Sequence, residues 1–347
     1  MVAALLRRIA FLELNPQTDK LVPVRDASRN RFRSTVCRIV VPVHRLLITG
    51  DMGLVGGRLA RDALAQGYSI AGLDLRAEPP RRGDVRNAHD VARVVNGCVG
   101  IVHLAAVSRV IWGEQDPALC WSTNVDGTRT IIDAALASPQ RPWVVFASSR
   151  EVYGEPGQLP VADDAALAPV NVYGRSKVAG EQLVLGARAA GLRTAVVRLS
   201  NVYGSARDHA DRVVPAFVRA ALEGRPLRID GPTNTFDFTH VDDAVNGLLA
   251  VMRAVALGEM LPPLHLLTGQ PTSLGELAAL VLDLTSSTST MIEAPSRTFD
   301  VARFYGDPTR SAEVLGWRAS IPLRDGIVRL VAELREHRGA NARAELA

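Results

Sequence analysis

RLLITGDMGLVGGRLARDALAQGYSIAGLDL, residues 45–75, is enough to predict how this chain folds. Its first five residues are mostly apolar, and residues 68–75 form a second apolar run. Between the two runs, the glycine-rich segment 50–57 is followed by a helical pattern over residues 58–67. Apolar strands that alternate with helices are typical of a parallel sheet covered on both faces. The stretch therefore predicts the first strand, turn, helix and second strand of such a sheet.

The same alternation continues to about residue 204. Further strand and helix patterns follow as GIVHLAA (100–106), CWSTNVDGTRTIIDAALAS (120–138), WVVFASS (143–149), SKVAGEQLVLGARAAG (176–191) and RTAVVRLS (193–200). This order predicts an α/β fold with a doubly wound parallel sheet (Rossmann) over residues 45–204. Over residues 205–335 the alternation is less regular, which indicates a smaller C-terminal substrate-binding lobe, partly interleaved with the first domain. Residues 336–347 are expected to form a tail.

The charge of the chain is unevenly distributed. Residues 1–45 contain nine basic and three acidic residues, a net charge of +6, whereas the remainder has 31 basic and 33 acidic residues, a net charge of −2. A slightly acidic body does not favour binding to nucleic acid, so no such partner is expected. Residues 1–44 have no long apolar core and no cleavage site of a secretion signal, and we expect a poorly ordered N-terminal extension.

Cysteine usage and hydropathy indicate the compartment. Cys37, Cys98 and Cys120 match neither a disulfide framework nor a zinc site, so no metal is expected and a reducing cytoplasm fits best. No apolar run approaches the roughly 18 residues of a membrane span, and we expect no membrane partner.

The glycine-rich turn is the first candidate functional site. Gly50, Gly53 and Gly56 lie between a predicted strand and a predicted helix, and Asp74 follows Gly50 by 24 residues at the end of the next strand. Glycines allow a pyrophosphate to approach a helix N-terminus, and an acidic residue at this distance accepts hydrogen bonds from a ribose. The pattern predicts NAD as cofactor, although Arg76 weakens the preference over NADP.

Tyr173 and Lys177 form the second candidate site. They are four residues apart on a predicted helix and therefore share one face. The chain contains only two lysines among its 40 basic residues, Lys20 and Lys177, so an ammonium at this position is distinctive. A phenol is a poor base at neutral pH, and an adjacent ammonium would lower its pKa. The pair is therefore expected to act as a general base.

Nine short motifs occur in an order that is typical of one enzyme family. They are TGDMGLVGG (49–57), GDVRN (83–87), HLAA (103–106), NVDGT (124–128), SSREVYG (148–154), YGRSK (173–177), RLSNVYG (198–204), FDFTHVDD (236–243) and DPTRSAEVLGW (307–317). With these motifs the chain resembles the extended short-chain dehydrogenases/reductases of the NAD-dependent epimerase/dehydratase family. The resemblance implies an enzyme that acts on a nucleotide sugar, uses NAD and forms a homodimer.

The resemblance also implies roles for individual residues. Catalytic roles are implied for Ser149, Tyr173 and Lys177. Contacts with NAD are implied for Gly50, Met52, Gly53, Leu54, Val55, Gly56, Asp74, Leu75, Asp84, Val85, Leu104, Ala105, Ala106, Asn124, Ala147, Tyr173 and Lys177. Contacts with the substrate are implied for Ser108, Ser149, Asn201, Arg212, Phe236 and Arg297.

Two departures from the family pattern leave the activity open. Phe236 replaces an arginine that usually clamps the nucleotide diphosphate. Glu151 matches a residue that dehydratases and decarboxylases use on the sugar ring, but Arg150 stands where those dehydratases usually have Asp or Ser. We expect a nucleotide-sugar epimerase that acts through a keto-sugar intermediate. The alternatives are a 4,6-dehydratase or decarboxylase that uses Glu151 as a catalytic residue, and a dehydrogenase of a free sugar or sugar acid.

Overall fold

The structure, a computed structural model, describes residues 12–15, 20–23, 44–297, 299 and 301–344, with side chains described between residues 44 and 337. The chain divides into two compact units, Met1–Pro42 and Val43–Ala347. In the first unit, β1 (Leu12–Asn15) pairs antiparallel with β2 (Lys20–Pro23). The rest of the expected extension lies outside the described residues.

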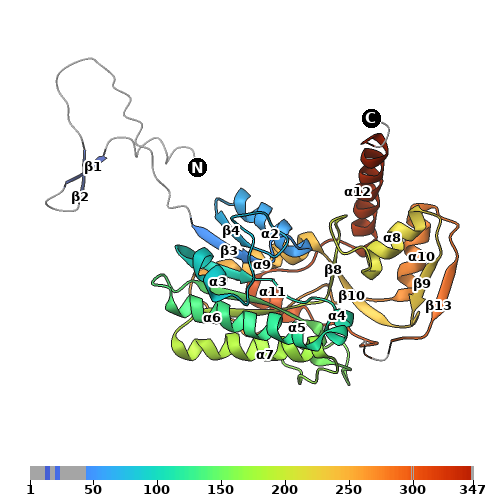
Figure 1. Cartoon of the computed structure of the whole chain (residues 1–347), viewed down its shortest axis with the longest axis horizontal. Coiled ribbons are helices and arrows are strands. Elements are labelled where there is room, and N and C mark those ends of the chain that lie inside the picture. Colours follow the sequence, from blue (N-terminus) through green and yellow to red (C-terminus); the bar gives the residue numbers. More distant parts are fainter. Residues whose placement is uncertain (1–11, 16–19, 24–43, 298, 300, 345–347) are drawn as a thin grey trace, which may run out of the picture. The chain divides into compact units, whose positions relative to one another are not determined.

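A six-stranded parallel sheet forms the centre of the second unit (Figure 1). Its strands are β3 (Arg45–Thr49), β4 (Ser69–Leu73), β5 (Cys98–His103), β6 (Trp143–Ser149), β7 (Thr194–Leu199) and β11 (Leu264–Leu266). They are ordered β11-β7-β6-β5-β3-β4, and each neighbouring pair is parallel. This topology confirms the predicted doubly wound fold.

Helices cover both faces of this sheet because successive strand residues point to opposite sides. Leu46 and Ile48 pack in one core with α2 (Leu54–Ala65) and α9 (Val241–Ala256). Leu47 packs in the other core with α3 (Ala88–Val95), α6 (Gly127–Ala137) and α7 (Val172–Gly186). The unbroken apolar strands of the sequence therefore correspond to a sheet that is buried on both faces.

A second lobe is built mainly from residues after 200. It contains a three-stranded sheet of β8 (Asn201–Tyr203), β10 (Thr235–His240) and β12 (Pro271–Ser273), and a parallel pair of β9 (Leu227–Asp230) and β13 (Met291–Ala294). Strands β8, β9 and β10 pack with α8 (Val213–Leu222), α10 (Leu274–Thr285) and α12 (Leu323–Ala344) around one apolar core. Helix α10 begins with a capping box between Ser273 and Glu276, which satisfies the first N–H groups of the helix.

The chain then returns to the first sheet. Helices α9 and α11 (Thr309–Leu315) and strand β11 follow the first part of the lobe in sequence but pack with the large sheet. Helix α12 continues beyond the boundary expected at residue 335. Within the residues that the structure describes, none of the helices has the length and apolar character needed to cross a membrane.

Short helical segments complete the fold on the side of α7. They are α4 (Val110–Gln115), α5 (Pro117–Trp121), the π-helical turn η1 (Ser122–Asp126), and the 3-10 turns η2 (Arg150–Tyr153) and η3 (Ala187–Ala190). Segment η2 directly follows strand β6. The strand order reverses between β3 and β5, and in doubly wound folds ligands bind outside the carboxyl ends of the strands at this point. The predicted site residues come from the loops at this edge.

Candidate active site

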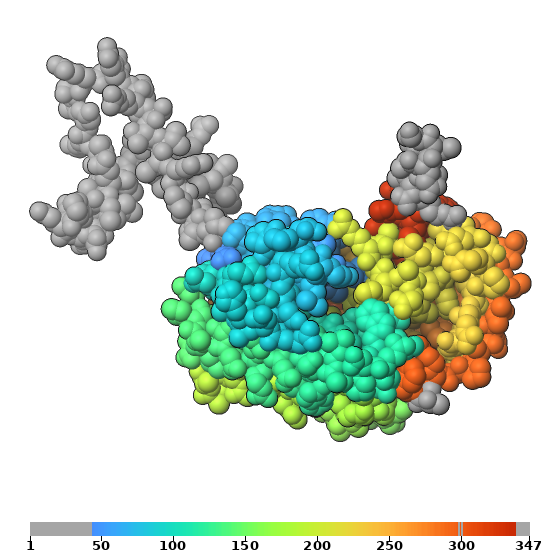
Figure 2. Space-filling view, in the orientation of Figure 1, coloured from blue at the N-terminus to red at the C-terminus, as the bar shows by residue number. Residues whose placement is uncertain are grey.

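A cavity of about 690 Å³ lies between the carboxyl edge of the large sheet and the second lobe. Figure 2 shows the hollow between the segment coloured blue, which follows β3, and the segment coloured yellow, which belongs to the lobe. The predicted site residues that line the cavity are Gly50, Gly53, Leu54, Val55, Gly56, Asp74, Leu75, Asp84, Val85, Leu104, Ala105, Ala106, Ser108, Ala147, Ser149, Glu151, Tyr173, Lys177, Asn201, Arg212, Phe236 and Arg297. The cavity thus brings nearly the whole predicted set together.

The glycine turn has the geometry that a dinucleotide needs. Gly50 has φ +74°, a conformation that favours glycine, and a Cβ on Gly56 would lie 2.2 Å from the carbonyl oxygen of Gly50. Gly53 is the N-cap of α2 and makes no side-chain cap hydrogen bond. The first N–H groups of α2 therefore remain available to a ligand, and Leu54 and Val55 line the cavity. These residues fit a bound pyrophosphate.

Asp74 lies at the end of β4 and is buried. Its Oδ2 accepts a hydrogen bond from the Met52 N–H (3.1 Å), and its Oδ1 accepts one from the Arg76 N–H (2.8 Å). The carboxylate is thereby oriented at the cavity wall, where it fits the ribose that the sequence predicts. The side chain of Met52 is 42% exposed, and the residue does not line the cavity. Its backbone N–H supports Asp74 instead.

Helix α7 presents Tyr173 and Lys177 to the cavity. Asn171 caps the helix by accepting a hydrogen bond from the Gly174 N–H (2.7 Å). Lys177 Nζ donates to the carbonyl oxygen of Ala147 on β6 (2.8 Å) and lies 5.8 Å from the centroid of the Tyr173 ring. Burial lowers the pKa of Lys177 to about 8. The helix cap and the bond to β6 together fix both side chains relative to the sheet.

Burial dominates the electrostatic environment of Tyr173. Burial raises the pKa of Tyr173 to about 12, while a hydrogen bond with Ser149 and the charge of Arg212 oppose this rise. The lowering of this pKa that is expected from Lys177 together with a bound oxidised nicotinamide stays a prediction. The ring is almost fully buried, and desolvation disfavours a phenolate more than the neighbouring groups favour it.

Three polar residues follow one another where β6 ends and η2 begins: Ser149, Arg150 and Glu151. Ser149 Oγ accepts a hydrogen bond from the Glu151 N–H (3.2 Å). Glu151 is buried and both its carboxylate oxygens have partners: Oε1 pairs with Arg150 Nη2 (2.9 Å), and Oε2 accepts from Asn171 Nδ2 (2.7 Å). The carboxylate is thus held by two neighbours at the wall of the cavity.

Phe236 contacts Arg150. The guanidinium carbon of Arg150 lies 4.6 Å from the centroid of the Phe236 ring and 5.8 Å from that of Phe304. Phe236 is itself buried, at 7% exposure. The residue that replaces the family's arginine therefore supports an arginine that comes from the end of β6. Sequence reasoning missed this role of Arg150.

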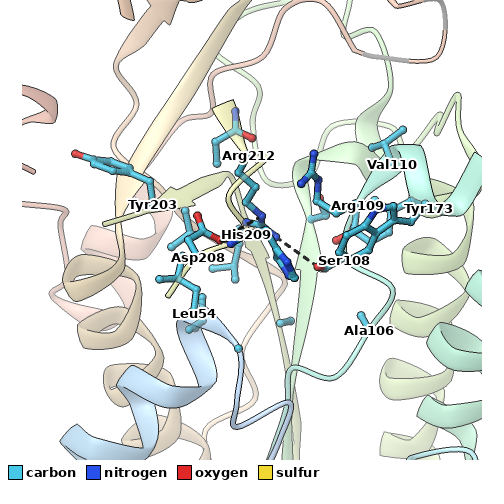
Figure 3. A pocket seen from close by; sticks show the side chains of 18 of the residues that line it. Leu54, Ala106, Ser108, Arg109, Val110, Tyr173, Tyr203, Asp208, His209 and Arg212 are labelled. Atoms are coloured by element: carbon cyan, nitrogen blue, oxygen red, sulfur yellow. Dashed lines mark hydrogen bonds and ion pairs between the residues drawn. The ribbon is translucent and has the colours of Figure 1, made fainter. Parts of the chain in front are cut away.

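A polar bridge crosses the cavity from the loop before α8 to the segment before α4 (Figure 3). Arg212 Nη2 lies 3.4 Å from Ser108 Oγ, and Arg109 pairs with Asp211 (2.5 Å). The ring of His209 packs edge-on against Trp112, with centroids 5.0 Å apart. The predicted substrate residues Ser108 and Arg212 are thus joined across the cavity.

Asn124 is the other predicted cofactor residue that does not line the cavity. It lies in η1 and is buried. Its Oδ1 accepts from the Val107 N–H (2.8 Å), and its Nδ2 donates to Ser176 Oγ on α7 (2.9 Å). Asn124 therefore ties the loop after β5 to the helix that carries Tyr173, which fits a supporting role and not direct contact.

Sequence analysis did not predict a buried ion pair that joins α7 to β7. Glu181 on α7 and Arg198 on β7 form two hydrogen bonds (2.9 and 2.6 Å), and Ser148 Oγ donates to Glu181 Oε1 (2.5 Å). The pair fixes α7 against the strands that carry the other site residues. Arg198 interrupts an apolar strand pattern, TAVVRL, and this interruption is the sequence signal that could have indicated the pair.

Comparison with known proteins identifies the family. Residues 46–261 match the model of the NAD dependent epimerase/dehydratase family. A UDP-glucose 4-epimerase of Mycolicibacterium smegmatis is 31% identical over 307 residues, which cover 83% of this chain and 97% of that protein. A dTDP-glucose 4,6-dehydratase of Streptomyces griseus is also 31% identical and covers 84% of this chain and 94% of its own length. The chain belongs to the NAD dependent epimerase/dehydratase family.

Solved structures agree with this assignment. MoeE5 in complex with UDP-glucose and NAD superimposes with a TM-score of 0.78 at 28% identity, covering 84% of this chain and 99% of its own. DesIV, a dTDP-glucose 4,6-dehydratase from Streptomyces venezuelae solved with NAD, gives a TM-score of 0.76 at 29% identity and covers 85% of this chain and 98% of its own. The predictions of an enzyme and of NAD as its cofactor are confirmed.

Proposed function

We propose that the protein is an NAD-dependent nucleotide-sugar epimerase that acts through a transient keto-sugar. The observation that carries the proposal is the arrangement at the end of β6. Ser149, Tyr173 and Lys177 line one cavity, while both carboxylate oxygens of Glu151 are held by Arg150 and Asn171. A carboxylate that is engaged on both oxygens is a weaker candidate for elimination chemistry on the sugar ring, and this favours epimerisation over the alternatives.

The chain's own residues would divide the chemistry as follows. Tyr173 accepts the proton of the sugar hydroxyl when the carbon is oxidised and returns it when the carbon is reduced. Ser149 hydrogen-bonds the reacting oxygen in both states. Lys177 holds its ammonium close to the phenol ring and stabilises negative charge on it.

The expected cofactor contacts follow from the same cavity. The N-terminus of α2 would hold the pyrophosphate of NAD, Asp74 the adenosine ribose, and the loop Leu104–Ala106 the adjoining part of the dinucleotide. Bound NAD would supply a reversible hydride acceptor for the sugar carbon and a positive charge near Tyr173.

Asn201 and Arg297 come from the second lobe and line the same cavity, which suits the nucleotide part of the substrate.

We also propose a homodimer in which the helical segment 116–137 and α7 of the two copies form a four-helix bundle. Leu119 and Trp121 on α5 are 41% and 45% exposed, and such apolar side chains suit an interface. Light scattering at micromolar concentration tests this; a monomer would contradict it.

The activity is tested by incubating the purified protein and NAD with a panel of nucleotide sugars. We expect a product of unchanged mass whose NMR spectrum shows inversion at one carbon. Loss of water would favour a 4,6-dehydratase, and loss of carbon dioxide a decarboxylase. Accumulation of NADH with a free sugar or sugar acid would favour a dehydrogenase. Each of these three results would contradict the epimerase.

A further inference from the structure

Arg150 has a buried hydrogen-bonding group that lacks a partner among the described residues. The residue is 9% exposed and lines the cavity, and its Nη1 makes no hydrogen bond with any part of the chain that the structure describes. Its Nη2 is engaged by Glu151 at 2.9 Å. A buried nitrogen that lacks an acceptor is unfavourable, and more so when the group is charged. Such a group at the wall of a binding cavity points to a ligand that completes it.

The guanidinium is also held in one orientation. The faces of Phe236 and Phe304 lie 4.6 and 5.8 Å from its central carbon, and Glu151 fixes one edge. Glu151 is in turn held by Asn171. Because the plane is fixed before a ligand arrives, little side-chain entropy is lost on binding. The free Nη1 is therefore a preorganised donor for an oxygen of the substrate.

The position of Arg150 indicates which part of the substrate it meets. It directly follows Ser149, which lines the cavity together with Tyr173, so it belongs to the end of the cavity where the sugar would react. Arg212, Arg228 and Arg297 also line the cavity, and they come from the second lobe, where the nucleotide is proposed to bind. An anion beside Ser149 would therefore be a substituent of the sugar.

We propose that Arg150 binds a carboxylate on the sugar, so that the preferred substrate is a nucleotide-linked sugar acid. A planar guanidinium pairs with a carboxylate more strongly than with a neutral hydroxyl, because both partners are charged. This inference rests on the proposed function of the same cavity. It adds the substrate class and a specificity-determining residue.

Two substrates that differ in one group test the proposal. UDP-glucuronic acid and UDP-glucose differ only in a carboxylate against a hydroxymethyl group. We expect kcat/KM of the full-length, NAD-loaded protein to be at least about tenfold higher for the acid, which corresponds to roughly 1.4 kcal/mol. Titration calorimetry with each nucleotide sugar gives the same comparison without turnover.

Variants separate binding from folding. In Arg150→Gln the preference for the acid should fall to within about twofold, mainly through a higher KM. Arg150→Lys keeps a cation without the planar fork and should retain an intermediate preference. Arg324→Gln is the matched control, because it makes the same substitution at an exposed arginine that pairs with Asp283 and does not line the cavity; it should keep the preference. Thermal unfolding and NAD titration of each variant reveal any general damage.

The outcomes are distinguishable. Turnover of UDP-glucose with no preference for the acid would overturn this inference and leave the proposed epimerase intact. If Arg150→Gln lowered kcat/KM equally for both nucleotide sugars, the inference would also be overturned. This result would indicate a phosphate contact or a structural role for Arg150. Oxidation of free glucuronate that depends on Arg150 would support the carboxylate site and overturn the epimerase. Failure to bind or convert any of the three compounds would overturn both.

Discussion

Lys177 Nζ lies 5.8 Å from the centroid of the Tyr173 ring, one helical turn away on α7, while donating a hydrogen bond to the Ala147 carbonyl oxygen on β6. The same ammonium lies 4.9 Å from the centroid of the Phe146 ring. A compact ammonium fits between two rings and a strand more readily than a planar guanidinium does. This enclosure gives a physical reason for a lysine here in a chain whose basic residues are otherwise almost all arginines.

Tyr173→Phe should leave the fold and NAD binding intact and lower turnover by roughly 100- to 1,000-fold, because the proton acceptor is removed. Steady-state kinetics with a nucleotide sugar that the parent converts give the result. The matched control is Tyr153→Phe, since Tyr153 is buried in the same region but bonds His265 and Arg198 and does not line the cavity. Turnover of Tyr173→Phe within tenfold of the parent would remove Tyr173 from the mechanism.

Lys177→Met should lose activity but unfold less easily at pH 7. Burial lowers the pKa of Lys177 to about 8, against 10.5 in an unfolded chain, a difference of roughly 3 kcal/mol. Between those values the unfolded chain binds more protons, so the stability of the parent rises with pH and the advantage of the methionine shrinks. Urea unfolding at pH 7 and pH 9.5 measures both effects. A methionine variant less stable than the parent at pH 7 would contradict the argument.

Lys177→Arg is the control for charge. It keeps a cation at the position but replaces the compact ammonium with a larger planar group. We expect turnover to fall with this variant too. Full activity would show that charge alone is required and that the shape of the ammonium is not.

Asp74→Ala should weaken NAD binding and reduce discrimination against NADP. The carboxylate is held at the cavity wall by the Met52 and Arg76 N–H groups, where it would meet a ribose hydroxyl and repel a 2′-phosphate. Fluorescence titration with both cofactors measures the ratio of their dissociation constants. An unchanged ratio would mean that another group sets the preference.

Phe236→Arg should lower stability by about 2–3 kcal/mol, because a second guanidinium would be buried beside that of Arg150. Phe236→Leu, which removes the aromatic face but adds no charge, should be affected less. Urea unfolding of both variants provides the comparison. If Phe236→Arg were as stable as the parent and bound a nucleotide sugar with a lower KM, a phosphate would lie at this position after all.

The parts of the site that sequence analysis predicted are those with local signals. The glycine turn, Asp74 and the Tyr173–Lys177 pair depend on spacings within one strand–helix unit or one helix, and the structure brings them to one cavity. The fold followed from the alternation of apolar runs with helical patterns. Both predictions depend on residues that are close in sequence. Such residues keep the same relative positions within a helix or strand, whatever other parts of the chain pack on them.

The remaining features depend on burial and on contacts distant in sequence. Phe236 meets Arg150 across 86 positions, and no local pattern encodes that contact. The rise that burial causes in the pKa of Tyr173 could not be predicted, because the sequence does not give the extent of burial. Sequence analysis placed Asn124 near the site. Only its hydrogen bonds to Val107 and Ser176 show that it joins the loop after β5 to α7.

One measurement tests the proposed epimerase most directly: conversion of a nucleotide sugar in D₂O, with the product returned to H₂O and analysed by mass spectrometry and NMR. If the hydrogen that leaves the carbon comes back from the enzyme and not from solvent, the product has the mass of the substrate, inverted configuration and no carbon-bound deuterium. A product that has lost water or carbon dioxide and carries deuterium on carbon would contradict the proposal and assign elimination or decarboxylation to the same site.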